Sequence, residues 1–103
     1  MTFELLLVEE ASCPWCERFD EEIASIYPLT SEGKFAPLRR LDIADANESG
    51  INFVSRPRFT PTFILIKQNA EIGRIEGYPG EDFFWGLLEM MLKQHTDYGG
   101  NPS

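Results

Sequence analysis

The sequence has few cysteines, no long apolar run and few basic residues, and each shortage excludes a class of protein. Only two cysteines occur in 103 residues, whereas a disulfide-stabilised secreted scaffold usually carries four or more, spread along the chain. No stretch of about 18 apolar residues is present, so no membrane span is predicted. The net charge of −8 argues against nucleic acid or an anionic membrane as a partner, because phosphate groups are bound by basic patches.

The length and the hydrophobic content are those of one small globular domain. The hydrophobic fraction of 43% is enough for a single modest core. We expect a domain over residues 1–97 and a flexible tail over 98–103. Residues 1–4 show no basic segment followed by an apolar stretch, so no signal peptide is visible. The sequence leaves open whether a leader segment was removed ahead of its first residue.

Alternating apolar and polar segments predict an α/β domain with the element order β-α-β-(α)-β-β-α. Residues 3–8 are almost continuously apolar, which is typical of a central strand buried on both faces. Further strands are expected over 38–43, 62–67 and 71–76, the last two joined as a hairpin. Residues 44–58 are polar and irregular, with room for one short helix. These elements predict a mixed four-stranded sheet flanked by helices.

Two amphipathic helices are expected to cover this sheet. The first spans 14–27, with Ser12 as its cap and Pro14 in its first turn. The second begins at Glu81, because acidic residues are favoured at a helix N-terminus. Its predicted apolar face consists of Phe84, Leu87, Leu88 and Met91. Packing in the core or at its edge, rather than a binding patch, is expected for Phe83, Trp85 and Met90.

The two cysteines lie in Cys13-Pro14-Trp15-Cys16, at the expected junction between the first strand and the first helix. A thiol at a helix N-terminus faces unpaired N–H groups, which favour the nucleophilic thiolate. Cys16 falls one turn later, on the apolar side of the helix, where burial favours the protonated form. This spacing predicts Cys13 as the attacking sulfur and Cys16 as the resolving sulfur. Trp15 is expected to be exposed between them, where it either contacts a partner protein or packs against the loop of the motif itself.

The cysteine pair has two other interpretations, a zinc site and an inert disulfide. A structural zinc site needs four ligands, and His95, far along the chain, is the only other plausible ligand. An inert disulfide would close a very small loop and would stabilise the fold little. A second feature is Thr60-Pro61 at the start of a strand, where proline is tolerated. Its peptide bond could be cis, although X-Pro bonds are usually trans.

Three landmarks, in this order, resemble the thioredoxin superfamily. They are the segments 12–16 (SCPWC) and 59–63 (FTPTF) and then Gly77 before the last helix. The resemblance implies a thioredoxin-like fold that lacks the extra N-terminal strand and helix of classical thioredoxin. It implies catalytic roles for Cys13 and Cys16 and substrate contacts at Pro14, Trp15, Thr60 and Pro61. It further implies that Pro61 is cis and lies against the cysteines, and that the Thr60 backbone pairs with a substrate chain.

Other residues narrow this resemblance. Pro-Trp stands between the cysteines instead of Gly-Pro, and Leu7 stands where classical thioredoxins keep a buried acid, so the proton acceptor for Cys16 is left open. The segment 76–80 (EGYPG) is similar to periplasmic bacterial proteins, especially the small SoxS-type thioredoxins of sulfur-oxidation gene clusters. This similarity implies a periplasmic location if a signal segment was removed, with the cytoplasm as the alternative.

The sequence therefore predicts a monomeric protein thiol–disulfide oxidoreductase without a bound cofactor or metal. Its expected partners are protein disulfides, one of them a sulfur-oxidation component, and a redox protein that donates electrons. One alternative is a glutathione-dependent glutaredoxin, in which Glu81 and Asp82 would meet the glutathione amine. Another is a non-catalytic module that binds Cu(I) or zinc through the cysteines. Arg56 and Arg58 are expected near the thiols, either to lower the pKa of Cys13 and receive an acidic partner or merely as solvated charges.

Overall fold

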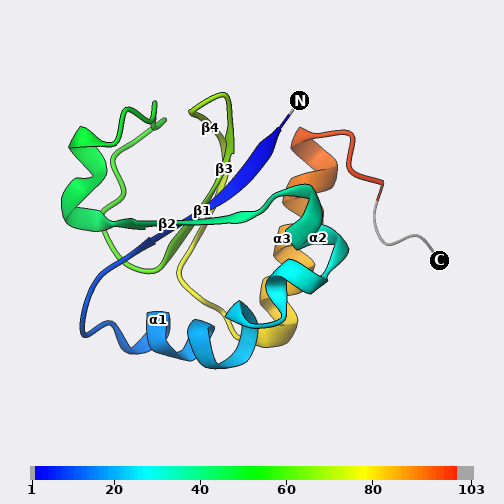
Figure 1. Ribbon diagram of the computed structural model, residues 1–103, viewed down its shortest axis with the longest axis horizontal. Helices are drawn as coiled ribbons and strands as arrows, with labels where there is room; N and C mark the ends of the chain where they lie inside the picture. The colour runs from blue at the N-terminus through cyan, green and yellow to red at the C-terminus, as the bar shows by residue number, and fades with distance from the viewer. Residues whose placement is uncertain (1, 100–103) are drawn as a thin grey trace.

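The computed structural model describes residues 2–99, which form a four-stranded sheet with helices packed against it (Figure 1). The strand order is β2-β1-β3-β4. Strand β1 (Phe3–Glu9) runs parallel to β2 (Leu38–Asp42) and antiparallel to β3 (Thr62–Lys67), and β3 forms a hairpin with β4 (Ala70–Glu76). The predicted mixed four-stranded sheet is therefore confirmed.

The first predicted helix is correct in its start but not in its regularity. Helix α1 (Pro14–Phe19) passes into a π-helical turn at Asp20–Ala24 and then a 3₁₀ turn at Tyr27–Leu29. Its N-cap is Cys13, not Ser12 as predicted, because Ser12 adopts a left-handed backbone conformation with φ of 62°.

Three further helical segments follow, and one of them was not expected. Helix α2 (Ser31–Phe35) is the unexpected one. Thr30 caps it, since its Oγ1 accepts a hydrogen bond from the Gly33 amide at 3.0 Å. A 3₁₀ segment, Ile43–Glu48, fills part of the region for which one short helix was expected, and α3 (Glu81–His95) is the predicted last helix. In the described part of the chain, no helix combines the length and apolarity that crossing a membrane requires.

The core has two parts, one on each face of the sheet. The larger part lies under α1, α2 and α3, and the smaller part lies on the face near the 3₁₀ segment (Figure 1). Leu5 and Leu7 of β1 enter the larger part, whereas Leu6 and Val8 enter the smaller part. Strand β1 is thus buried on both faces, as its apolar run predicted. Because β1 lies in the centre of the sheet, the turn that follows it and carries the cysteines lies at one end of the sheet.

An aromatic cluster connects α1, β3 and α3 on the larger side. The Phe19 ring lies 4.9 Å from that of Phe63 and 5.4 Å from that of Phe84, and the Phe63 and Phe84 rings are 4.9 Å apart. Tyr78 packs edge-on against Phe19 at 5.8 Å. Aromatic rings therefore anchor the helix that carries the cysteines on the sheet.

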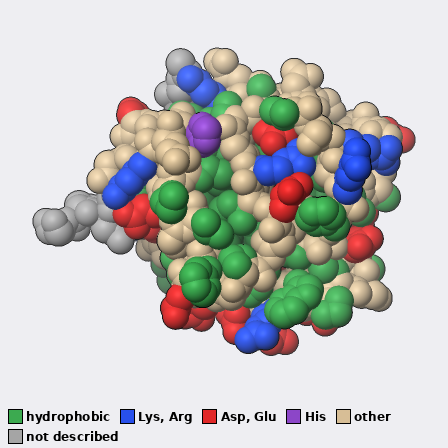
Figure 2. All heavy atoms as spheres, turned by 180° about the vertical axis from the view of Figure 1, so that it is seen from behind, with side chains coloured by type: hydrophobic (Ala, Val, Ile, Leu, Met, Phe, Trp, Pro, Cys, Tyr) green, Lys and Arg blue, Asp and Glu red, His purple; other side chains and the backbone are tan. Residues whose placement is uncertain are grey.

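Several expectations about exposure were wrong. Leu87 was predicted on the apolar face of α3, and Phe83 and Met90 were predicted to pack, but all three side chains are exposed. Ile26, near the end of the first expected helix, is also exposed. Helix α3 is apolar on several sides, and the core is filled from one of them by Phe84, Leu88, Met91 and Leu92. Figure 2 shows hydrophobic side chains gathered on the side of the molecule where α3 lies.

The predicted tail begins too early. Tyr98 is buried, its ring packs edge-on against Phe35 at 5.1 Å, and its hydroxyl forms a 2.8 Å hydrogen bond with that of Ser31. An aromatic ring with a polar tip can fill such a site when the hydroxyl finds a partner. The ordered chain therefore includes Tyr98, and residues 100–103 of the expected tail lie outside the described residues.

A hydrogen bond between Tyr78 and Glu22 makes one part of the stability dependent on pH. The Tyr78 hydroxyl donates to Glu22 Oε1 at 2.6 Å. This bond lowers the pKa of Glu22 below its ordinary value of 4.5. Because the pKa is lower in the folded state, the stabilisation is present above the unfolded pKa and is lost as pH falls through the folded pKa.

We expect Tyr78→Phe to lower the free energy of unfolding at pH 7, and to lower it progressively less below pH 4.5. Urea titrations at a series of pH values would measure this difference. Tyr27→Phe is the matched control, because the Tyr27 hydroxyl donates to the neutral carbonyl of Ala36 at 2.6 Å, so its loss should not vary over this range. A Tyr78→Phe effect that is equal at pH 7 and pH 3 would contradict the assignment.

Candidate active site

The cysteines are placed by the turn that joins β1 to α1. The chain leaves the sheet after Glu9 and turns at Ser12, and Cys13 then adopts an extended conformation, with φ of −98° and ψ of 106°. A residue before proline favours this conformation, and Pro14 itself suits a first helical position. Cys13 thus becomes the helix cap, and its Sγ accepts a hydrogen bond from the Cys16 amide at 3.2 Å.

Cys13 and Cys16 are joined by a disulfide, with their Cα atoms 5.2 Å apart. Both residues are buried, with 6% and 4% of their surface exposed. Exposure therefore does not distinguish the two sulfurs in this oxidised form, contrary to the expected contrast in burial. What distinguishes them is the amide hydrogen bond, which only Cys13 Sγ receives among the described residues. A donor aimed at this sulfur favours negative charge on it when the disulfide opens.

The other two sequence landmarks meet the cysteine turn at one end of the sheet. Val8 pairs with Thr62 in the β1–β3 register, so the end of β1 and the start of β3 are adjacent. The Thr60–Pro61 bond is cis, as the family resemblance implied. Thr60 Oγ1 donates to Glu10 Oε1 at 3.0 Å, which connects the two loops directly. The Gly77 amide donates to the Pro61 carbonyl at 2.8 Å and brings in the third landmark.

Exposed aromatic and basic side chains stand in the segments next to this meeting point in the sequence. Trp15 is largely exposed, as predicted, and the Arg18 guanidinium lies 5.8 Å from the centre of its ring. Phe59, beside Thr60, is half exposed. Arg56 and Arg58 are also exposed, and neither forms an ion pair within residues 2–99.

The opposite flank of the cysteine turn carries a network of charged side chains. Arg40 donates to Glu9 at 2.9 Å and to Asp20 at 2.7 Å. The hydrogen bond with Asp20 is the main reason why the pKa of Arg40 is raised.

Leu7, at the position of the family's buried acid, is fully buried in the larger core. An apolar side chain therefore stands in the core at this position of β1.

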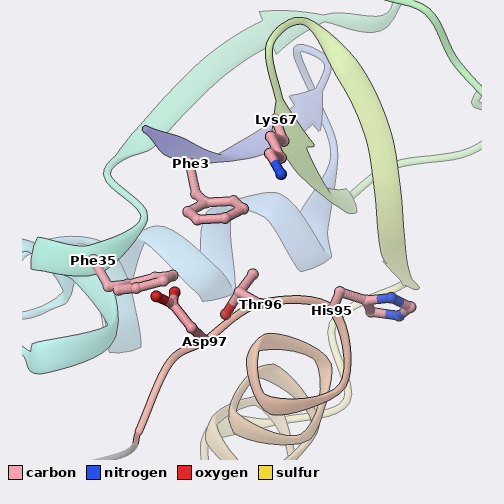
Figure 3. A pocket seen from close by; sticks show the side chains of 6 residues that line it. All are labelled: Phe3, Phe35, Lys67, His95, Thr96 and Asp97. Atoms are coloured by element: carbon pink, nitrogen blue, oxygen red, sulfur yellow. The ribbon is translucent and has the colours of Figure 1, made fainter. Parts of the chain in front are cut away.

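His95 lies far from the cysteines. It lines a pocket of about 440 Å³ at the other end of the sheet, together with Phe3, Phe35, Lys67, Thr96 and Asp97 (Figure 3). Phe3 begins β1 and the cysteines follow its end, and a seven-residue strand spans about 20 Å. His95 therefore cannot complete a zinc site with Cys13 and Cys16. Within residues 2–99, no group of three or more His, Cys, Asp or Glu side chains is arranged to hold a metal ion.

Sequence reasoning missed the residues that fix the loop before Pro61. Glu71 and Arg74 of β4 bind each other and the backbone of residues 54 and 55. In the sequence they read as ordinary charges on a half-exposed strand, and no local spacing connects them to a loop about 17 residues earlier. The only available signal was two opposite charges three positions apart on a predicted strand.

No protein-family model matches the sequence, and no curated protein matches it. Among solved structures, the chain is similar to the periplasmic thioredoxin SoxS from Paracoccus pantotrophus in its reduced form. The TM-score is 0.85 and the identity is 47%, over 89% of this chain and 97% of that chain. Two other thioredoxins share the fold. Mala s 13 of Malassezia sympodialis has a TM-score of 0.64 at 19% identity, over 91% of this chain and 75% of its own. NaTrxh of Nicotiana alata has 0.62 at 20%, over 93% and 75%.

The geometry and the comparison with SoxS agree. A cysteine pair capping a helix, a cis-proline loop beside it and a glycine bound to that proline lie at one end of a mixed sheet. Nearly half of the aligned residues are identical to those of a solved thioredoxin along almost its whole length. The chain therefore belongs to the thioredoxin family, within its SoxS group, and is a thiol–disulfide oxidoreductase.

Proposed function

We propose that this chain reduces disulfides of partner proteins, with Cys13 as the attacking sulfur and Cys16 as the resolving sulfur. The observation that carries the proposal is the hydrogen bond from the Cys16 amide to Cys13 Sγ at the start of α1. It favours the Cys13 thiolate in the reduced protein, and the thiolate is the nucleophile in disulfide exchange. In this assignment Cys16 waits as a thiol one turn further along the helix.

The reaction proceeds in two exchange steps. The Cys13 thiolate attacks one sulfur of the substrate disulfide, that bond breaks, and the other substrate sulfur leaves as a thiolate. Cys16 then loses its proton and attacks Cys13 Sγ, which releases the second substrate thiolate and forms the Cys13–Cys16 disulfide. Two electrons pass to the substrate, and the disulfide described above is the product state of the protein. A dithiol protein must return these electrons.

A substrate chain has a place to bind beside the disulfide. Within residues 2–99, neither the amide nor the carbonyl of Thr60 makes a backbone hydrogen bond. An extended substrate segment pairing with these groups would lie next to the cysteine turn, to which Thr60 is tied through Glu10. We assign substrate contacts to Thr60 and Pro61 on this side, and to Pro14 and Trp15 between the sulfurs.

The similarity to SoxS supports a proposal for where in the cell this chain acts and on which proteins. That protein is described as a periplasmic thioredoxin, and it matches this chain at 47% identity. We therefore propose a periplasmic location and a substrate among the proteins of sulfur oxidation, with the chain acting as a monomer and not on nucleic acid. Reduction through glutathione is the alternative to be tested.

Single-turnover reduction tests this function. The chain would be reduced with dithiothreitol, separated from that reagent, and mixed with insulin that retains its disulfides. We expect about one substrate disulfide to be reduced per chain, since each chain carries one dithiol. A sample alkylated at its cysteines is the control. No reduction above that control would overturn the proposal, and turnover sustained by glutathione and glutathione reductase alone would favour the glutaredoxin alternative.

A further inference from the structure

Residues 52–59, named here the 52–59 arm, are held against the outer edge of β4. The Asn52 amide donates to the Asn69 carbonyl at 2.8 Å, and the Glu71 amide donates to the Asn52 carbonyl at 2.9 Å. Two residues further on, the Val54 amide donates to Glu71 Oε1 at 2.8 Å. Arg74 Nη2 donates to the Ser55 carbonyl at 2.5 Å. Four hydrogen bonds thus fix the first part of the arm, residues 52–55.

The two side chains that hold the arm are themselves tightly paired. Arg74 donates to both carboxylate oxygens of Glu71, at 2.7 and 2.8 Å. Only 5% of the Glu71 side chain and 14% of the Arg74 side chain are exposed. Removing one partner of such a pair leaves a poorly compensated charge, so each partner holds the other in place. The position of the arm therefore depends on the charge of Glu71.

The outer surface of the arm is apolar and basic. Pro57 is buried, and the residues on either side of it, Arg56 and Arg58, are exposed, as are Val54 and Phe59. In the described part of the chain, five of the nine basic residues form ion pairs: Arg18, Arg39, Arg40, Arg74 and Lys93. The two arginines of the arm do not. On a protein of net charge −8, the arm is thus a locally basic surface.

This surface is connected to the turn that carries the cysteines through Thr60. Phe59 directly precedes Thr60, whose side chain is bonded to Glu10 in the turn before Cys13. Arg58 lies two residues from Thr60, a distance of at most about 7 Å along an extended chain. Basic side chains gather on the right of Figure 2, the side on which the segment between the 3₁₀ segment Ile43–Glu48 and β3 lies. A protein docked at the disulfide would therefore meet the arm.

We propose that the 52–59 arm is a docking surface for partner proteins that carry acidic residues close to the disulfide being reduced. The inference rests on the proposed function and specifies its substrate class. Two exposed arginines that form no ion pair within residues 2–99 attract carboxylates, and such attraction raises association rates and falls as salt screens it. Val54 and Phe59 supply apolar contact around the charges. The Glu71–Arg74 pair, by holding residues 54 and 55, keeps the arginines and the apolar side chains of the arm in place relative to the cysteines.

Three peptides of equal length would test the arm, each with one cysteine capped by thionitrobenzoate and flanked by Asp, Ser or Lys. At low ionic strength, the reduced protein should release thionitrobenzoate from the Asp peptide about tenfold faster than from the Ser peptide, and more slowly from the Lys peptide. The doubly substituted Arg56→Gln, Arg58→Gln protein should react with all three alike and retain the Ser-peptide rate. Lys34→Gln, another exposed basic residue without an ion pair in the described chain, is the matched control and should keep the preference.

A second variant separates the arginines from their placement. Glu71→Gln keeps Arg56 and Arg58 but removes the charge that holds the arm, so it should lose most of the Asp preference while its circular dichroism stays native. Equal rates for the three peptides in the unmodified protein, or a preference that persists without both arginines, would overturn the proposal. Failure to react with any of the peptides would instead overturn the proposed function, and the arm with it.

Discussion

Cys13→Ser is expected to abolish disulfide reduction, with a fall of about a thousandfold or more, because the covalent route is lost with its nucleophile. Cys16→Ser should behave differently. It retains the helix-capping thiol and the amide that donates to it, so the first exchange step should proceed and the second should not. The protein should then accumulate as a mixed disulfide with its substrate. Single-turnover mixing, followed by non-reducing electrophoresis and mass spectrometry, distinguishes the two outcomes.

The comparison between the two serine variants is internally controlled. Each lacks the Cys13–Cys16 disulfide, so a shared change in stability would affect both equally. A mixed disulfide that forms through Cys16 in the Cys13→Ser protein, at the rate seen through Cys13 in the other variant, would contradict the assignment. The roles of attacking and resolving sulfur would then have to be exchanged.

Phe84→Ala is expected to cost about 3–5 kcal/mol of unfolding free energy, the usual range for emptying a buried phenylalanine site. A domain of this size has about 5–15 kcal/mol in total, so much of the stability would be lost. The matched control is its neighbour Phe83, which is 71% exposed while Phe84 is fully buried. Phe83→Ala should stay within about 0.5 kcal/mol of the unmodified protein. Denaturant titration of both variants measures the difference.

The reason for the large effect is the place of Phe84 between three elements. Its ring contacts Phe19 at the end of α1 and Phe63 in β3, so the cavity would open under the helix that carries the cysteines. Reduction of insulin by Phe84→Ala should therefore decline at temperatures where Phe83→Ala is unaffected. Equal stability of the two variants would show that this ring cluster does not hold α1 in place.

The strands could be predicted because their signal is local. The apolar run in β1 reflects burial on both faces, and the hairpin of β3 and β4 is encoded by two strand-like segments with a short turn between them. The outward side of α3 could not be predicted, since Phe83, Leu87 and Met90 are as apolar as the buried residues and only packing selects among them. The π-helical turn at Asp20–Ala24 likewise interrupts a segment that the apolar spacing predicts to be one regular helix.

The same distinction holds for the site. Cys13, Cys16, Thr60 and Pro61 stand in short motifs, and the sequence indicated that they belong together. The Glu71–Arg74 pair acts on residues 54 and 55, which are distant in sequence and meet β4 only after the chain has folded. Cys13 as the helix cap was also missed, because the left-handed turn at Ser12 shifts the cap by one residue. Neither a contact between distant residues nor a left-handed turn produces a periodic pattern in the sequence.

The pairing of Asn52 with the start of β4 also bears on how one molecule meets another. Strands β2 and β4 are the two edges of the sheet, and a bare edge offers N–H and C=O groups to which a second chain can add a strand. Asn52 already occupies these groups at the start of β4. On β2, the consecutive charged residues Arg39 and Arg40 make the edge a poor template for such addition. The segment that we propose to receive substrates thus also protects part of the sheet against aggregation through its edge.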